Sequence, residues 1–115
     1  MKVIEIGNKE YEIKYTINTL VRMESDGLDV MHMENLINNI NFSLVRKLFY
    51  YGLMNSVGKS LTENKAGDMM DEYLEKCDYR ELMTILFSEL ARALGHDVDA
   101  KNQGEAEESN DEAGK

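Results

Sequence analysis

The sequence contains no proline, no tryptophan and a single cysteine among its 115 residues. One cysteine cannot form an internal disulfide, and no Cys/His cluster has the spacing of metal ligands, so the composition is typical of a reducing compartment. The longest apolar runs are only a few residues long, whereas a membrane-spanning helix needs about 18. The first residues also lack the apolar run of a signal peptide. We therefore expect a cytoplasmic protein that is neither secreted nor inserted in a membrane.

Positive charge is also scarce, because 13 Lys and Arg residues face 22 Asp and Glu residues and the formal net charge is -9. Proteins that follow nucleic-acid backbones present stripes of Lys and Arg. Anionic membranes attract the same residue types. The charge balance therefore argues against nucleic acid and membranes as partners.

The acidic residues are concentrated at the C-terminal end. Residues 96–115 hold seven acids and two bases, a net charge of -5, so the rest of the chain accounts for only -4 of the total of -9. Apart from Val98, the apolar content of this segment consists of Ala and Gly, which is too little to offset the entropy of ordering it. We predict a single folded domain over residues 1–95 and a disordered acidic tail over residues 96–115.

Two short segments of alternating character predict an N-terminal β-hairpin over residues 2–15. Gly7-Asn8-Lys9 separates the two segments and supplies residues that tolerate positive φ. Because a two-stranded hairpin is at best marginally stable alone, we expect its apolar face to lie on helices. The residues of that face are Ile4, Ile6, Tyr11, Ile13 and Tyr15.

Over residues 18–95 the apolar positions follow the 3.6-residue period of helices. We predict a short helix that is capped by Asn18 and ends at Asp26-Gly27, followed by a short amphipathic piece over about residues 31–38. A stronger helix begins at Asn41 or Ser43 and ends at Gly58.

Two further helices complete the predicted domain. The first runs from Thr62 to Cys77, and the second begins at a capping box formed by Asp78 and Glu81 and ends at Gly95. The predicted fold class is α+β and mostly helical, with the N-terminal β-hairpin packed on a small bundle of four to five helices.

Two motifs resemble ligand sites but lack required residues. Gly58-Lys59-Ser60 resembles the end of a phosphate-binding loop, yet Leu53 stands where that loop needs glycine. Asp97-Val98-Asp99 with Glu108 resembles a calcium loop, but Lys101 occupies a ligand position. We interpret the first as a helix stop and the second as a solvated acidic segment.

Few side chains could carry chemistry. Met31-His32-Met33 offers soft ligands for Cu(I), but such methionines more often fill a core or an interface. Cys77 has no histidine neighbour and is expected to be a buried, inert thiol. His96 is the only other histidine. We therefore expect no catalytic residues, no metal and no cofactor, and a protein that is not an enzyme.

Surface apolarity is the remaining signal. Phe49-Tyr50-Tyr51 covers about 200° of a helix circumference, so these three rings cannot all face one core. The last helix poses the same difficulty around Met83 and Phe87. One interpretation is that a small bundle buries a wide stripe. The other is that Tyr50, Tyr51, Met83 and Phe87 face another chain, with self-association and partner binding equally compatible.

Several segments occur in a distinctive order. They are Ile4-Glu5-Ile6-Gly7-Asn8-Lys9-Glu10-Tyr11-Glu12-Ile13-Lys14-Tyr15, Thr16-Ile17-Asn18-Thr19-Leu20 with Glu24, Leu48-Phe49-Tyr50-Tyr51-Gly52-Leu53 and Leu61-Thr62-Glu63, followed by a final apolar helix and an acidic tail. This order resembles the tail assembly chaperones of long-tailed siphophages, of related prophages and of gene-transfer agents. The resemblance covers about residues 2–95 and consists of loose patterns of residue type.

The resemblance implies a specific role. Such chaperones lie in the host bacterial cytoplasm, are absent from the mature virion and coat the tape measure protein until tail tube subunits replace them. A longer form, made by programmed ribosomal frameshifting, adds a domain that recruits the tail tube protein. Gly114-Lys115 at the end of the sequence is compatible with a slippery codon pair.

Two other functions remain open at this point. A structural tail completion or connector protein would share the small size, but it would be found in purified particles. An acidic regulator that mimics nucleic acid would need acids patterned over the folded surface, whereas the net charge of residues 1–95 is only -4.

Overall fold

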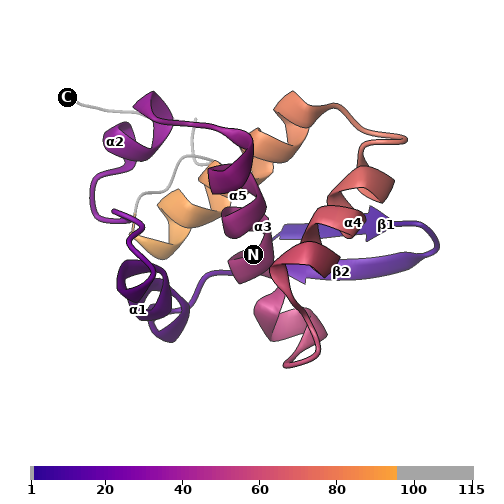
Figure 1. The fold of residues 1–115 in the computed structure, drawn as a ribbon, viewed down its shortest axis with the longest axis horizontal. Coiled ribbons are helices and arrows are strands. Elements are labelled where there is room, and N and C mark those ends of the chain that lie inside the picture. Colours follow the sequence, from indigo (N-terminus) through magenta and orange to yellow (C-terminus); the bar gives the residue numbers. More distant parts are fainter. Residues whose placement is uncertain (1, 96–115) are drawn as a thin grey trace.

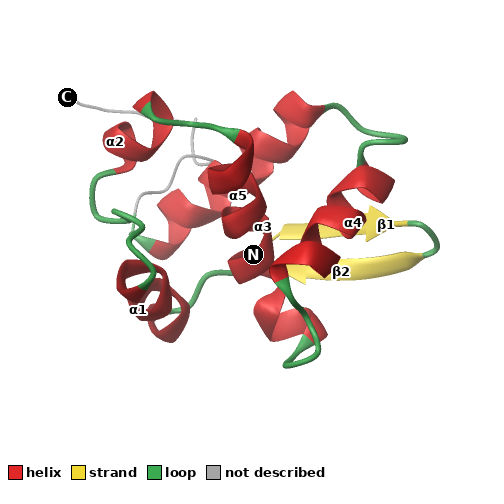
Figure 2. Cartoon of the chain, viewed as in Figure 1, coloured by secondary structure: helices red, strands yellow, loops and turns green. Residues whose placement is uncertain are grey.

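The computed structural model describes residues 2–95, which form one antiparallel β-hairpin and five helices (Figure 1). The hairpin lies on one side of the molecule beside α4, and α1 and α2 lie on the opposite side (Figure 2). The predicted α+β, mostly helical class is confirmed. The predicted acidic tail, with its calcium-loop resemblance and Gly114-Lys115, lies outside the described residues. The elements are β1 (Lys2–Ile6), β2 (Lys9–Ile13), α1 (Ile17–Ser25), α2 (Met33–Asn38), α3 (Phe42–Val57), α4 (Glu63–Tyr73) and α5 (Tyr79–Ala93).

The predicted hairpin forms, but its second strand runs from Lys9 to Ile13 and its turn has two residues, because Lys9, predicted in the turn, pairs within the sheet. Ile4 pairs with Tyr11 and Ile6 with Lys9, so Gly7 and Asn8 alone connect the strands. Gly7 has φ of 63°, a conformation that glycine adopts without a steric penalty. The face that carries Ile4, Ile6 and Ile13 is buried.

β2 and the segment after it pack closely against the middle of α3. The Lys14 N–H donates to the Gly52 carbonyl at 3.0 Å, and the Tyr15 hydroxyl donates to the Leu48 carbonyl at 2.6 Å. A Cβ added at Gly52 would lie 2.9 Å from Cγ2 of Ile13. Glycine at position 52 therefore allows the hairpin to approach the helix.

Two predicted helix ends were wrong by a few residues. Thr16, rather than Asn18, caps α1, because Thr16 has extended backbone angles and its side chain accepts the Thr19 N–H at 3.2 Å. α4 ends at Tyr73 rather than at Cys77. The Lys76 N–H bonds to the Tyr73 carbonyl three residues back, which tightens the chain into turns before Asp78 begins the next helix.

The other caps agree with the local sequence signals. Asn41, and not Ser43, caps α3, because its side chain accepts the Leu44 N–H at 2.8 Å. Gly58 ends that helix with φ of 95°. Thr62 caps α4, and Asp78 with Glu81 forms the capping box of α5.

The core is built around α3, which supplies buried residues on several sides. Phe49, Leu48 and Leu53 are fully buried there, and α5 contributes Leu82 and Leu86. A helix surrounded in this way buries more of its circumference than a surface helix does. The wide apolar stripe of α3 is therefore mostly core.

Candidate functional site

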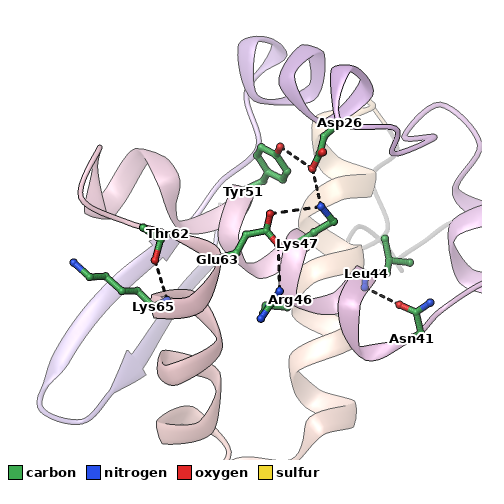
Figure 3. Close-up of polar contacts among 9 residues, drawn as sticks. All are labelled: Asp26, Asn41, Leu44, Arg46, Lys47, Tyr51, Thr62, Glu63 and Lys65. Carbon is green, nitrogen blue, oxygen red and sulfur yellow. Dashed lines mark hydrogen bonds and ion pairs between the residues drawn. The ribbon is translucent and has the colours of Figure 1, made fainter.

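The four residues predicted to face a partner separate into two groups. Tyr51 is buried, and its hydroxyl donates to Oδ2 of Asp26 at 3.1 Å (Figure 3). Burial and the neighbouring carboxylate raise the pKa of Tyr51. The structure corrects the predicted exposure of this residue, because Tyr51 belongs to the contact between the end of α1 and α3.

Tyr50 is half-buried, and its ring packs edge-on against Tyr51 at a centroid distance of 5.0 Å. It lines a hollow of about 240 Å³ with Arg22, Met54 and Lys59, among others. Met83 and Phe87 lie instead on α5 and line a different hollow. Tyr50 therefore does not share a surface depression with the two α5 residues.

The polar contacts around Tyr51 connect three helices (Figure 3). Lys47 on α3 places Nζ 3.0 Å from Oδ2 of Asp26 and 3.5 Å from Oε2 of Glu63, the first residue of α4. The hydrogen bond between Lys47 and Asp26 lowers the pKa of the Asp26 carboxyl and raises the pKa of the Lys47 amine. Partly exposed ion pairs of this kind stabilise a fold by about 1 kcal/mol or less. The cluster links α1, α3 and α4 to one another, which is a structural role.

Met83 and Phe87 open onto an apolar groove. It has a volume of about 270 Å³ and lies between α5 and the segment around the end of α2. Ile37 and Ile40 form the opposite wall, and their side chains are 50% and 38% exposed. We call this hollow the α2–α5 groove, and its lining residues are Ile37, Ile40, Met83, Thr84 and Phe87.

The apolar surface continues beyond the groove. Phe42 begins α3 and packs against Tyr79 at a centroid distance of 5.4 Å, yet 76% of it is exposed. Tyr79 precedes Met83 by four residues and Phe87 by eight, so these three side chains share one face of α5. We call the continuous surface the apolar strip, and its members are Ile37, Ile40, Phe42, Tyr79, Met83 and Phe87.

The apolar strip ends at an acidic hollow. This hollow, of about 430 Å³, is bordered by Phe42 and Tyr79 and by Asp68 and Asp71 on α4. Arg46 also lines it, but its guanidinium pairs with Glu63 at 3.5 Å. The uncompensated charge at this end of the strip is therefore negative.

Only two of the six members of the apolar strip, Met83 and Phe87, could be predicted from the sequence. Ile37 was predicted only as an apolar position of the short amphipathic piece, and Ile40, Phe42 and Tyr79 received no role. Each lies near a predicted helix end, where the 3.6-residue period gives little information about facing. One sequence signal did point to Phe42. Because Asn41 caps α3, Phe42 is the first residue of that helix and precedes the first buried positions, Leu44 and Val45.

The side chains considered for chemistry have ordinary surroundings. His32 is exposed, and its Nδ1 lies 2.9 Å from Oδ1 of Asp29; this contact raises the pKa of His32. Cys77 is half-buried in the turn after α4. Burial, with a contribution from Cys77, raises the pKa of Tyr73 to about 12. Between residues 2 and 95, no group of three His, Cys, Asp or Glu side chains is placed to hold a metal ion.

Glu89 is a buried carboxylate that sequence reasoning missed. Its Oε2 accepts the Tyr15 N–H at 3.2 Å and pairs with Arg92 at 2.6 Å, while Arg92 also donates to the Tyr15 carbonyl at 3.4 Å. Burial raises the pKa of Glu89, but hydrogen bonds, including these two, outweigh that effect and lower the pKa to about 2. The pair thus satisfies the backbone of Tyr15, which is a structural task.

Comparisons with protein-family models, with characterised proteins and with solved structures found no match to this chain. None of the helices in residues 2–95 combines the length and the apolarity needed to cross a bilayer.

Proposed function

We propose that this protein is a tail assembly chaperone of a siphovirus or prophage, which coats the tape measure protein during construction of a long tail. The observation that carries the proposal is the apolar strip. Phe42 and Ile37 expose large apolar side chains at its two parts, Phe42 beside Tyr79 and Ile37 in the α2–α5 groove, and exposed apolar surface of this kind marks a binding site.

The charge of the chain supports the same role. A tape measure protein is implied to be a very long, helix-rich and apolar chain that would aggregate if left bare. A coat protein with a net charge of -9 would cover that chain through the apolar strip and keep the coated complex soluble through mutual repulsion.

Co-expression with the tape measure protein of the same genome tests the proposal. We expect the full chain to keep the tape measure protein in the soluble fraction. The double variant Met83→Asp/Phe87→Asp introduces two charges into the apolar strip and should return most of the tape measure protein to the pellet. Phe42→Asp should have the same effect, and its exposed position at the start of α3 makes it compatible with folding.

Val21→Asp is the matched control. Val21 is 53% exposed on α1 and lines none of the hollows that contain the strip. This variant adds the same single charge as Phe42→Asp and likewise removes an exposed apolar side chain. If Val21→Asp and the folded strip variants solubilise the tape measure protein equally well, the assignment of the strip fails.

The remaining parts of the proposal concern the virion and the tail tube. We propose that the protein acts in the host cytoplasm and leaves before the tail is complete, so mass spectrometry of purified particles should detect no copies. A longer frameshifted form would recruit the tail tube protein. Reading the codons of Gly114 and Lys115 tests that form, because codons other than a slippery pair remove its support. Detection of the protein in particles would favour a tail completion or connector protein.

A further inference from the structure

We propose that the apolar strip binds one amphipathic helix of the partner, and that the end of this helix lying over Tyr79 carries Lys or Arg side chains. This inference rests on the proposed function in taking the partner to be a helical client. Beyond that function, it specifies the surface that binds, the secondary structure that is bound and the end of the bound helix that carries basic side chains.

The dimensions of the strip fit a helix of about two turns. Tyr79, Met83 and Phe87 extend about 12 Å along α5 at 1.5 Å per residue. A bound helix with apolar side chains at i, i+4 and i+7 covers nearly the same length. Ile37 and Ile40 line the shallow, open α2–α5 groove together with Met83 and Phe87, so this groove can receive the apolar face of such a helix.

The charges beside the strip determine which end of the bound helix carries basic side chains. At the Tyr79 end, Asp68 and Asp71 line the acidic hollow, where Glu63 compensates Arg46. At the Phe87 end, the residues that line the groove are all uncharged. Basic side chains on the bound helix are therefore stabilised at one end only.

The same charges disfavour a second copy of this chain as the occupant. Each copy carries a net charge of -9 and would bring acidic surface against acidic surface. The strip of one copy would also have to cover the strip of the other with Asp68 and Asp71 nearby. A basic amphipathic helix meets neither obstacle.

Synthetic peptides of 18 residues provide the probe. The first peptide has Leu at i, i+4 and i+7 on a Gln/Ala background, with three Lys in its last turn. The second has three Glu in place of the Lys, and the third keeps the Lys but has Ser in place of the Leu. Each peptide is also made in a second version that has the charged residues in its first turn instead. Every peptide is labelled and titrated with the full chain at 150 mM salt, and its fluorescence anisotropy is measured.

We expect saturable binding of the Leu/Lys peptide, and roughly tenfold weaker binding of the Leu/Glu peptide. The Ser/Lys peptide controls for attraction to the acidic residues 96–115 and should not bind. Asp68→Asn/Asp71→Asn should remove the preference for Lys over Glu. Phe42→Asp should abolish binding, and Ile37→Asn, at a half-exposed position, should weaken it with the helical circular dichroism unchanged.

Three outcomes would overturn the inference. They are equal binding of the Leu/Lys and Leu/Glu peptides, unchanged binding to folded Phe42→Asp and Ile37→Asn, and displacement of the peptide by self-association of the chain. These readouts are separate from the solubility of the tape measure protein. If the peptides bind as expected but the tape measure protein stays insoluble, the proposed function fails while the helix site stands.

Discussion

Gly52 and Gly67 are both helical glycines, but their surroundings differ. A Cβ at Gly52 would meet Ile13 at 2.9 Å and the hydroxyl of Tyr15 at 3.3 Å, and Tyr15 cannot move without losing its bond to Leu48. A Cβ at Gly67 would meet only Arg46, with Cδ at 3.2 Å, and the long, partly exposed Arg46 side chain can shift.

We therefore predict opposite effects of alanine at the two positions. Gly52→Ala should lower the free energy of unfolding by about 1–3 kcal/mol through overpacking. Gly67→Ala should raise it by up to about 0.5 kcal/mol, because alanine favours the helix by about 1 kcal/mol and the shift of Arg46 offsets part of that gain. Urea denaturation measures both. A stable Gly52→Ala variant would contradict the close approach of β2 to α3.

Glu89 makes stability depend on pH in a defined direction. Its pKa is about 2 in the folded protein, against an ordinary value of 4.5. A lowered folded-state pKa adds stability that is complete above pH 4.5 and is lost as the pH falls towards 2. Glu89→Gln should therefore cost on the order of 2–3 kcal/mol at pH 7.

The difference between wild type and Glu89→Gln should shrink by roughly half between pH 7 and pH 3. Urea denaturation at a series of pH values measures it. A difference that is constant across this range would show that the Glu89 charge does not contribute through its pairing with Arg92.

Residue identity alone could not reveal these roles. Tyr51 and Glu89 lie on amphipathic helices and have unremarkable neighbours in the sequence. The burial of each depends on residues far along the chain, since Tyr51 meets Asp26 and Glu89 meets Tyr15. The role of Gly52 likewise follows from the distance between two elements, which periodicity does not encode.

At the scale of elements, local capping signals were reliable because they act within four residues. Asp78 accepts the Arg80 N–H at 2.8 Å, and Glu81 accepts the Asp78 N–H at 3.0 Å. Asn41, Gly58 and Thr62 acted as predicted for the same reason. The end of α4 was missed because an apolar period continued past the last helical hydrogen bonds.

The capping box gives a prediction for α5. Asp78→Ala should lower the free energy of unfolding by about 1 kcal/mol, because it leaves N–H groups at the start of α5 without an acceptor. Glu75→Ala is the matched control, since it removes an exposed acid from the preceding turn without touching the cap, and it should change stability by less than about 0.5 kcal/mol. Thermal denaturation distinguishes the two. Equal effects would mean that charge, and not capping, sets the contribution of Asp78.

Which face of α5 packs against the core could be determined only from the tertiary structure. Its apolar residues cover more of the helix than the core uses, so sequence gives two candidate faces. Leu82, Leu86 and Leu90 are fully buried in the core, whereas Met83 and Phe87 are half-buried, pack against the core and line the α2–α5 groove. Of the residues predicted to face a partner, the α5 pair is thus half-buried and partly accessible, whereas Tyr51 on α3 is buried. Partner binding by Met83 and Phe87 stays a prediction.

At the scale of the whole molecule, the core that the structure describes is built from residues 2–95. Deleting residues 96–115 removes a net charge of -5 from a total of -9. We predict that this deletion changes the thermal midpoint by no more than about 2 °C, because the described core is left intact. The truncated chain should elute earlier from an anion exchanger and precipitate at lower salt. A large loss of thermal stability would contradict the predicted boundary at residue 95.

The contacts of Tyr15 also determine when the N-terminal segment can pack during folding. The Tyr15 N–H and carbonyl are bound by Glu89 and Arg92, more than 70 positions later in the chain. During synthesis the hairpin segment emerges well before these partners are made. Contacts of such high sequence separation slow folding, because the chain must close a large loop before they form. The N-terminal segment therefore stays incompletely packed until α5 has left the ribosome, and completion of the last helix is the step that closes the domain.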